Sequence, residues 1–431
     1  MKVCVYGLWH LGTVMAACLA SRGIATVGLA ETPEAAAELN AGKAPLFEPG
    51  LDVLLEQGLK SGTLSFTQDV AAAVPSADLL WLGFDTPVDD DDVADVGYVL
   101  DRVRLTFPYL KDGAVVLVSS QVPVGSTARL EHDFAAVAKG RKVFFAYSPE
   151  NLRLGDAIRV FTEPERIVIG IRDDDACKVI EPVLKPFCQT LLWTRVESAE
   201  LVKHALNSYL ATCVTFTNEI ASICESVAAD MSEVEAALRL DPRVGKKAYV
   251  RAGSAFGGGT LARDVQFLKA VARDQDVVVH VLAAVLESND HHKKWVVRHL
   301  GRELGALSGR KIGVLGLAYK AGTDAIRRSV AIEVIEELIA EKADVTVFDP
   351  KVSTLPDPLA SAVTIASSVG AVFANSEAVV LATEWPEFRE LNFATFVPSM
   401  KRALLIDQNA FASKQLSDFS GLDYIVAGKV R

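Results

Sequence analysis

The feature that most constrains the fold is the opening of the chain, where strand-like and helix-like segments alternate around a glycine turn. Residues 2–7 (KVCVYG) form a short β-branched run that ends at a glycine, and an Ala-rich helical pattern continues to Ser21. A second apolar run follows at residues 24–29. Strand, glycine turn, helix and strand is the beginning of a doubly wound α/β domain, so we expect a parallel sheet covered by helices.

The rest of the chain repeats this pattern on either side of a helical block. Further buried-strand runs occur at 79–84, 114–119, 142–147 and 167–171. From about Ser198 the period changes: residues 200–227 indicate one long helix, and more helical segments run to about Leu300. At 311–318 (KIGVLGLA) a new apolar strand ends in glycines, and strand-like runs follow at 344–348, 378–382 and 403–406. A chain of 431 residues exceeds one compact core. We therefore predict an α/β protein with a Rossmann domain at 1–197, a helical bridge and dimerisation region at 198–300, and a Rossmann-like domain at 301–431.

Composition narrows the functional classes. A formal net charge of −11 disfavours a nucleic-acid partner, since binding phosphates along a strand requires a basic surface. The six cysteines form no Cys-x-x-Cys pair and no histidine lies beside them, so we expect reduced thiols and no metal site. Gly7 and Gly12 interrupt the apolar N-terminus, and no apolar run reaches membrane-spanning length. We expect a cytoplasmic protein without a membrane partner, and a solvated loop at the aspartate cluster 89–92.

The first glycine turn is a weak dinucleotide-binding signal by itself. The fingerprint is Gly-x-Gly-x-x-Gly, and this chain has Gly7-Leu8-Trp9-His10-Leu11-Gly12, with Trp9 in place of the middle glycine. The acidic residue expected after the second strand falls on Ala30, and Glu31 follows directly. Glu31 would bind ribose hydroxyls and favour NAD over NADP. The alternative is a structural Rossmann domain that binds no cofactor.

The middle of the chain carries more specific motifs. Tyr147-Ser148-Pro149-Glu150 is followed by Lys203-x-x-x-Asn207 on the predicted long helix, where i, i+4 spacing directs the ammonium and the amide to one face. Residues 241–245 (DPRVG) and 256–264 (FGGGTLARD) come next, and glycines before a helix allow close approach of a ligand to the backbone.

With these motifs the sequence resembles the UDP-glucose/GDP-mannose dehydrogenase family over nearly its whole length. The resemblance also covers 40–45 (NAGKAP), 48–51 (EPGL), Thr86-Pro87, 122–125 (VPVG), 316–320 (GLAYK), 323–329 (TDAIRRS), 348–350 (FDP) and 383–385 (TEW). It implies NAD-dependent oxidation of a nucleotide sugar at C6, from alcohol through aldehyde to uronic acid. A UDP-sugar is the implied substrate and a homodimer the implied assembly, with NAD in the first domain and the nucleotide sugar in the last. The active site would lie in the cleft between the two α/β halves.

The resemblance also implies roles for single residues. Lys203 and Asn207 match residues that stabilise the C6 oxyanion, Glu150 matches a carboxylate in acid–base chemistry, and Asp264 matches the acid behind the nucleophile. Arg243 matches an arginine that reaches the sugar across a dimer interface, and Lys320 a lysine near the nucleotide-sugar phosphates. The remaining expected substrate contacts are Leu152, Tyr249, Phe256 and Gly257. The expected cofactor contacts are Gly7, Trp9, Leu11, Gly12, Glu31, Thr86 and Arg327.

The positions at which this sequence differs from the family pattern are those of expected catalytic and substrate-binding residues. The pattern has a cysteine at the position of Thr260, which forms a thiohemiacetal and then a thioester. Roughly seven pKa units separate a hydroxyl from a thiol, which is on the order of 10 kcal/mol of extra activation. Gln121 stands where the family usually has a threonine near the reacting carbon, and Leu154 where many members have a second glutamate. Residues 407–409 (DQN) replace an Asp-Gly-Arg segment, so the expected arginine contact with the substrate is lost.

Three functions follow as hypotheses. The first is a 6-dehydrogenase that reaches the acid without a thioester, through the hydrated aldehyde and a second NAD; it is motivated by Glu150, Lys203, Asn207 and Asp264. The second is a two-electron dehydrogenase that stops at an aldehyde or acts on another hydroxyl, motivated by Thr260 and Gln121. The third is a non-catalytic nucleotide-sugar sensor or scaffold, motivated by Trp9 and Ala30.

Overall fold

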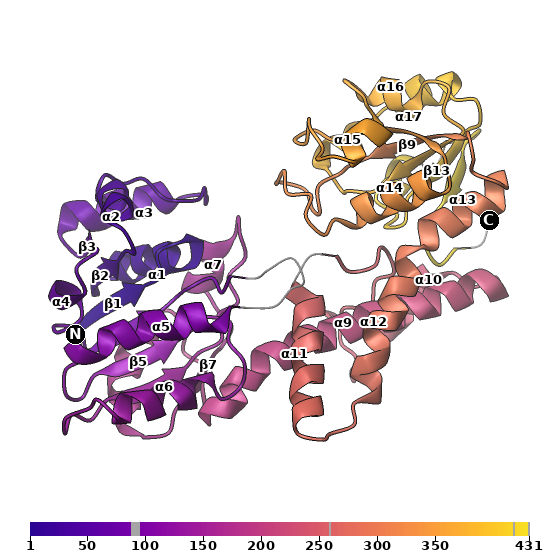
Figure 1. Ribbon diagram of the computed structural model, residues 1–431. Coiled ribbons are helices and arrows are strands. Elements are labelled where there is room, and N and C mark those ends of the chain that lie inside the picture. The colour runs from indigo at the N-terminus through magenta and orange to yellow at the C-terminus, as the bar shows by residue number, and fades with distance from the viewer. Residues whose placement is uncertain (88–94, 258–259, 417–418, 430–431) are drawn as a thin grey trace. The chain divides into compact units, whose positions relative to one another are not determined.

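The computed structural model describes residues 1–87, 95–257, 260–416 and 419–429. The chain divides into two compact units, Met1–His204 and Ala205–Arg431, each built around its own sheet (Figure 1). The long helix α9 (Val196–Val227) begins in the first unit and continues into the second. The three-part division predicted above stays a prediction, and the aspartate cluster 89–92 lies outside the described residues.

The first unit contains an eight-stranded sheet in the order β3-β2-β1-β4-β5-β6-β7-β8. Neighbouring strands are parallel except β6 and β7, which meet in an antiparallel pair at Tyr147 and Gly170. The strands are β1 (Lys2–Tyr6), β2 (Ala25–Leu29), β3 (Leu64–Thr67), β4 (Leu79–Leu82), β5 (Val115–Val118), β6 (Phe144–Tyr147), β7 (Ile167–Gly170) and β8 (Leu191–Thr194). Strands buried on both faces are apolar almost throughout, which explains the continuous hydrophobic runs in the sequence.

Helices cover both faces of this sheet and enclose two hydrophobic clusters. The cluster on one face includes Met15 and Leu19 of α1, and the cluster on the other includes Val99 and Leu100 of α5. The helices are α1 (His10–Ser21), α2 (Pro33–Asn40), α3 (Leu51–Ser61), α4 (Val70–Ala73), α5 (Val96–Thr106), α6 (Ser126–Ala135), α7 (Ala157–Thr162) and α8 (Asp175–Leu184). The carboxyl ends of β1, β2, β4, β5 and β6 lead into the predicted site residues of this unit, except Lys203, which lies on α9.

The second unit begins with helices and ends with a six-stranded, fully parallel sheet in the order β11-β10-β9-β12-β13-β14. After α9 the helices are α10 (Met231–Leu240), α11 (Thr260–Asp274), α12 (His280–Lys293) and α13 (Trp295–Leu304). The strands are β9 (Lys311–Leu315), β10 (Asp344–Phe348), β11 (Thr364–Ile365), β12 (Ala378–Leu381), β13 (Leu404–Ile406) and β14 (Asp423–Ile425). The later helices are α14 (Val330–Ala340), α15 (Leu359–Ala362), α16 (Val369–Phe373), α17 (Phe393–Phe396) and α18 (Ser413–Leu416).

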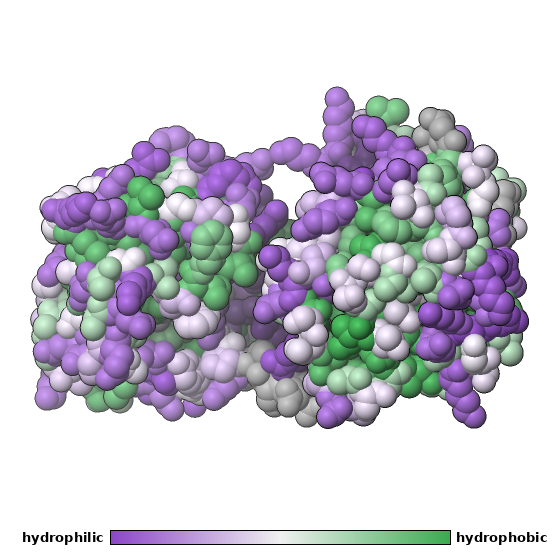
Figure 2. Space-filling model, turned by 90° about the horizontal axis from the view of Figure 1, so that it is seen from above, coloured by the Kyte–Doolittle hydropathy of each residue, from purple (hydrophilic) through white to green (hydrophobic). Residues whose placement is uncertain are grey.

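The predicted fold class is confirmed, because each unit has a doubly wound sheet of the Rossmann type. None of the described helices is both long and apolar enough to cross a membrane. On the face shown in Figure 2, hydrophilic side chains are interspersed with hydrophobic areas on each unit.

Candidate functional site

The turn between β1 and α1 has the geometry of a dinucleotide-binding loop despite its tryptophan. Gly7 has φ of +97°, and a Cβ there would lie 2.8 Å from the backbone nitrogen of Phe84. A Cβ on Gly12 would lie 2.0 Å from the carbonyl oxygen of Gly7, so only glycine allows the helix to approach the strand this closely. Trp9 is 54% exposed, so its indole extends into solvent. The residues that the turn requires are therefore present, and they fit a pyrophosphate at the N-terminus of α1, whose first turn also carries the partly buried Leu11.

A buried carboxylate ties this turn to the loop after β6. Glu48 lies 2.8 Å from His10 Nε2, and it accepts hydrogen bonds of 2.8 Å from the backbone N–H groups of Gly155 and Ala157. Both side chains are almost completely buried. Glu48 thereby links the cofactor turn to the segment that follows Glu150, and it gives the Glu-Pro-Gly motif a structural role.

The carboxyl end of β2 leads into a cluster of Glu31, Tyr98 and Arg102. Ala30 is buried and donates its N–H to the carbonyl of Thr67, while the side chain of Glu31 extends toward α5. The Tyr98 hydroxyl donates to the Glu31 carboxylate at 2.8 and 3.0 Å, and the Arg102 guanidinium forms an ion pair with it. Burial, and then this hydrogen bond, raise the pKa of Tyr98 to about 12, so the hydroxyl remains a donor at neutral pH.

Thr86 and Gln121 lie at the carboxyl ends of the adjacent strands β4 and β5. The Thr86 hydroxyl donates to the backbone carbonyl of Gln121 at 2.6 Å. The structure thus brings a predicted cofactor residue and a predicted catalytic residue together, through the backbone of Gln121.

Glu150 and Lys203 meet where β6 ends. Lys203 Nζ donates to the backbone carbonyl of Glu150 at 2.5 Å, and the Glu150 carboxylate accepts the N–H of Leu152. Burial raises the pKa of Glu150, and the Lys203 charge opposes that increase. A carboxyl whose pKa is raised by burial, beside a fixed ammonium, is suited to general acid–base chemistry.

The beginning of α6 explains a second family motif. Glu200 of α9 is completely buried and accepts N–H groups from Gly125 at 2.6 Å and Thr127 at 2.9 Å. A carboxylate at these positions satisfies the free donors of the first helical turn and complements its dipole. The Val-Pro-Val-Gly segment is therefore fixed to α9 three residues before Lys203.

In the second unit, Asn207 of α9 donates its side-chain amide to the carboxylate of Asp264 on α11. Both residues are buried, Asp264 completely. Thr260 is the first residue of α11 and is exposed, one helical turn before Asp264. Lys203 and Asn207 are also one turn apart, on the same continuous helix.

A polar network anchors the backbone that leads to α11. Asn289 of α12 pairs with both backbone groups of Phe256, at 2.9 and 3.0 Å. His292 Nε2 lies 2.8 Å from the carbonyl of Gly253, and burial lowers the pKa of His292, which keeps the ring neutral. The network also includes Asn218, which accepts from Gly253 N at 3.1 Å, and Asn409, whose side-chain oxygen accepts from Ser254 N at 2.7 Å. Side chains from α9, from α12 and from Asn409 therefore hold residues 253–256, which precede Thr260. Gly258 and Gly259 lie outside the described residues.

The replaced Asp-Gly-Arg segment belongs to this network. The Gln408 amide lies 3.0 Å from His292 Nε2, and the Asn409 carbonyl accepts from the Arg251 guanidinium at 2.6 Å. A Cβ on Gly253 would lie 2.3 Å from the Asn409 side-chain oxygen, so Gly253 permits this contact. Asn409 thus binds the segment around Gly253 directly, whereas Gln408 contacts it through His292.

Asp349 organises the turn of the second Rossmann-type sheet. Its carboxylate accepts N–H groups from Leu317 at 2.7 Å, Ala318 at 3.1 Å and the indole of Trp385 at 2.9 Å. Partial burial acts against the charge, but these donors, together with the N–H of Lys351, hold the pKa of Asp349 below its usual value. The Gly-Leu-Ala, Phe-Asp-Pro and Thr-Glu-Trp motifs are therefore parts of one structure.

Four other predicted substrate and cofactor residues are exposed within their unit. The Arg243 side chain is 88% exposed and pairs with Asp241, with Nη2 2.7 Å from Oδ2. Tyr249, Lys320 and Arg327 are exposed as well, and Lys320 Nζ lies 5.5 Å from the ring centroid of Tyr319.

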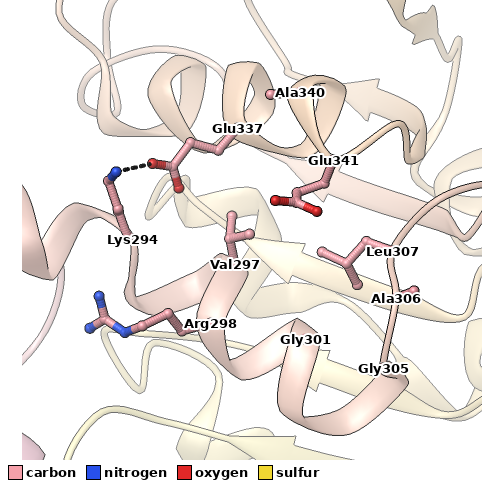
Figure 3. A pocket seen from close by; sticks show the side chains of 10 residues that line it. All are labelled: Lys294, Val297, Arg298, Gly301, Gly305, Ala306, Leu307, Glu337, Ala340 and Glu341. Carbon is pink, nitrogen blue, oxygen red and sulfur yellow. Dashed lines mark ion pairs between the residues drawn. The ribbon is translucent and has the colours of Figure 1, made fainter.

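A pocket of about 540 Å³ lies between α13 and α14, and none of the predicted site residues lines it (Figure 3). Lys294 and Arg298 line it opposite Glu337 and Glu341, and Lys294 Nζ lies 3.7 Å from Glu337 Oε1. Because the two positive side chains of this pocket face two negative ones, its charges do not favour binding of an anion such as a nucleotide phosphate. Among the described residues, no three His, Cys, Asp or Glu side chains gather as a metal-ligand set.

Sequence reasoning missed the residues that act through buried polar contacts. His10 is inside a quoted motif, but nothing in a single sequence pairs it with Glu48. Asn289 and His292 fall on the predicted helical block, where a polar residue on a buried helix face would have been the only signal.

Comparison with known proteins matches the whole architecture to one family. Three models of the UDP-glucose/GDP-mannose dehydrogenase family match the chain: the NAD binding domain at residues 1–188, the central domain at 197–291 and the UDP binding domain at 313–414. The UDP-glucose 6-dehydrogenase of Rhizobium meliloti (strain 1021) is 34% identical over 440 residues, which cover 100% of both chains. UDP-glucose 6-dehydrogenase TuaD of Bacillus subtilis (strain 168) is 32% identical over 96% of this chain and 90% of its own.

Solved structures agree with these relatives. A UDP-glucose dehydrogenase from the archaeon Pyrobaculum islandicum superposes with a TM-score of 0.82 at 32% identity, covering 96% of this chain and 95% of its own. The UDP-D-ManNAc dehydrogenase of Pyrococcus horikoshii has the same fold, with a TM-score of 0.84 at 24% identity and coverage of 100% and 99%.

Proposed function

The chain belongs to the UDP-glucose/GDP-mannose dehydrogenase family, and from that premise we propose that it oxidises a UDP-glucose-like sugar at C6 to the uronic acid with NAD. The primary alcohol loses a hydride and a proton to become an aldehyde. The aldehyde adds water, and the hydrate loses a second hydride and proton to become the acid. Two NAD⁺ accept the hydrides, and two NADH and two protons are released for each sugar.

The observation that carries this proposal is that the chain has the side chains expected to stabilise negative charge on the oxygen at C6. Asn207 is held by the buried Asp264, and Lys203 stands one turn away on the same helix with its ammonium fixed to the carbonyl of Glu150. Preorganised donors of this kind stabilise an alkoxide, and removal of one typically lowers the rate by about 10²–10³-fold. The same donors stabilise the alkoxide of the substrate alcohol and that of the hydrate, so one set supports both oxidations.

Glu150 supplies the proton chemistry in this account. Its carboxyl has a raised pKa and a cation beside it, which suits a group that takes the proton from water as it adds to the aldehyde. It returns that proton to solvent before the second oxidation.

Thr260 takes the position of the family's cysteine in this proposal and does not attack the aldehyde. Its hydroxyl is exposed at the N-terminus of α11. The acid is reached without a thioester because water, rather than a side chain, adds to the carbonyl.

The ligand contacts proposed for the two units follow the sequence predictions. Cofactor contacts in the first unit are Gly7, Trp9, Leu11, Gly12, Glu31 and Thr86. Arg327 is a further proposed cofactor contact, and Gln121 lies near the reacting carbon. Sugar and nucleotide contacts are Leu152, Arg243, Tyr249, Phe256, Gly257 and Lys320.

We also propose that the protein is a homodimer that associates through α9. Tyr209, Phe216 and Ile223 follow at seven-residue intervals, which places them on one helix face, and they are 63%, 50% and 55% exposed. Large apolar side chains at this spacing are typical of a helix that packs against a second copy. The proposed role of Arg243 at a partner's sugar depends on this dimer.

The proposal is tested by incubating the protein with NAD and a panel of UDP-glucose, UDP-N-acetyl sugars and GDP-mannose, and by identifying the products by mass spectrometry. A uronate formed from a UDP-sugar is the expected result. No turnover despite measurable sugar binding would indicate a sensor instead.

A two-electron dehydrogenase is the second candidate, and the threonine at position 260 is the observation that favours it. Without a thiol, the aldehyde is not captured as a covalent adduct. Accumulation of the aldehyde, with one NADH per sugar, would support this candidate.

A further inference from the structure

In the cluster of Glu31, Tyr98 and Arg102, the carboxylate alone would be enough to bind ribose hydroxyls, and the tyrosine and the arginine are additional. Glu31 follows β2, while Tyr98 and Arg102 stand one turn apart on α5. The guanidinium carbon of Arg102 lies 3.3 Å from the ring centroid of Tyr98, and the same tyrosine donates its hydroxyl to Glu31. The arginine is therefore held in one orientation by a stacked ring and a carboxylate.

We propose that Tyr98 and Arg102 fix Glu31 as the group that selects NAD over NADP, and that Arg102 forms a masked site for a 2′-phosphate. The proposal rests on the binding of the adenine-side ribose at the end of β2, beside Glu31. Arg102 is then a positioning residue, because it acts on the cofactor through the carboxylate.

Selection for NAD follows from the acceptor capacity of the carboxylate. An ionised carboxylate offers about four acceptor positions. The Tyr98 hydroxyl and the Arg102 guanidinium both bind on the α5 side, which leaves acceptor positions for the two ribose hydroxyls. A 2′-phosphate brings about two negative charges and no donor at neutral pH, so Glu31 repels it and the guanidinium remains engaged with the carboxylate.

The masked phosphate site is the Arg102 guanidinium, which has no carboxylate partner at position 31 once the charge of Glu31 is removed. Arg102 has a planar fork of donors that suits a phosphate, and its stacking contact with the Tyr98 ring involves no atom of Glu31. The Arg102 side chain is 30% exposed, so a ligand phosphate can reach it. With a neutral residue at position 31, the same arginine binds the group that it now helps to exclude.

The experiment measures NAD and NADP dissociation constants by calorimetry on the full chain, without any sugar. Three proteins are compared: the wild type, Glu31→Gln, and Glu31→Gln combined with Arg102→Gln. We expect the wild type to bind NAD at least tenfold more tightly than NADP. Glu31→Gln should shift the NADP/NAD affinity ratio at least tenfold toward NADP, and the second substitution should reverse that gain.

Two results would overturn the proposal: an affinity ratio unchanged by Glu31→Gln, or a gain in NADP affinity that survives loss of Arg102. Arg102→Lys in the Glu31→Gln background tests the fork geometry, since it keeps the charge and should retain only part of the gain. Circular dichroism of each variant establishes that it is folded. Because binding is measured without turnover, failure of the proposed oxidation would leave this result interpretable.

Discussion

At the scale of single residues, the Thr260 hydroxyl takes no part in the proposed chemistry. Because water adds to the aldehyde, Thr260→Ala should retain production of the uronate with a rate changed by less than about tenfold. Stopped-flow NADH absorbance with UDP-glucose and NAD measures this rate. A loss of 10³-fold or more in the second oxidation alone would mean that the hydroxyl is a nucleophile after all.

The matched variant is Thr260→Cys, with Thr260→Ser as its control. A thiol is ionised far more readily than a hydroxyl, so the cysteine should open a covalent route and accelerate oxidation of the aldehyde at least tenfold. Serine should leave that step within about threefold of the wild type. Equal rates for the serine and cysteine variants would show that the surrounding groups do not support a nucleophile at this position.

At the scale of elements, the anchored segment 253–257 determines how α11 begins. Asn289→Ala removes both hydrogen bonds to the backbone of Phe256 inside the protein, at a cost of about 2–3 kcal/mol. We expect a lower urea midpoint and faster amide hydrogen exchange at Phe256. Asn289→Asp keeps the acceptor and loses the donor, so it should be intermediate. An unchanged exchange rate at Phe256 in the alanine variant would contradict the anchoring role.

The turn after β9 gives a second prediction, in which pH is the variable. The pKa of Asp349 is lowered in the folded state, so its contribution to stability is complete above the pKa of an unfolded aspartate, about 3.9, and is lost as pH falls through the lower folded value. Asp349→Asn should reduce the free energy of unfolding by about 2–3 kcal/mol at pH 7, and the difference should shrink below about pH 4. Urea midpoints of both proteins between pH 7 and 3 test this, and a difference that does not vary with pH would count against it.

At the scale of the whole molecule, the exposed stripe on α9 predicts a dimer that one charge disrupts. Phe216→Glu places a carboxylate in the centre of the stripe and should yield a monomer by light scattering after size-exclusion chromatography. Phe47→Glu is the matched control, because Phe47 is 78% exposed but distant in sequence from α9 and should leave the dimer intact. A wild type that is monomeric at micromolar concentration would refute the proposed assembly.

Much of the fold was predictable because both sheets are built from strands that are buried on two faces. Such strands give continuous apolar runs, from which β1 and β9 were located, whereas the long α9 was located from the change of period. The strands β3 (LSFT), β11 (TI) and β14 (DYI) each contain polar residues, so they give no continuous apolar run. The boundary between the two units at His204 falls inside α9, and a sequence has no signal for a boundary within a continuous helix.

Candidate site residues could be predicted from the sequence where they belong to one short motif. Contacts between segments that are far apart in the sequence could not be predicted. The pair of Lys203 and Asn207 follows from helical spacing alone. The contacts of Glu48 with His10, of Glu200 with the first turn of α6, and of Asn409 with Ser254 join residues 38 to 155 positions apart, so spacing does not reveal them. The exposed position of Trp9 likewise required the structure.

The central claim is complete oxidation without a covalent thioester. The most direct measurement counts NADH per UDP-glucose consumed with NAD in excess, while intact-protein mass spectrometry monitors the enzyme during turnover. We predict two NADH per sugar, UDP-glucuronate as the product and no sugar adduct on the protein. One NADH with accumulated aldehyde, or an acyl adduct on any cysteine, would contradict this account.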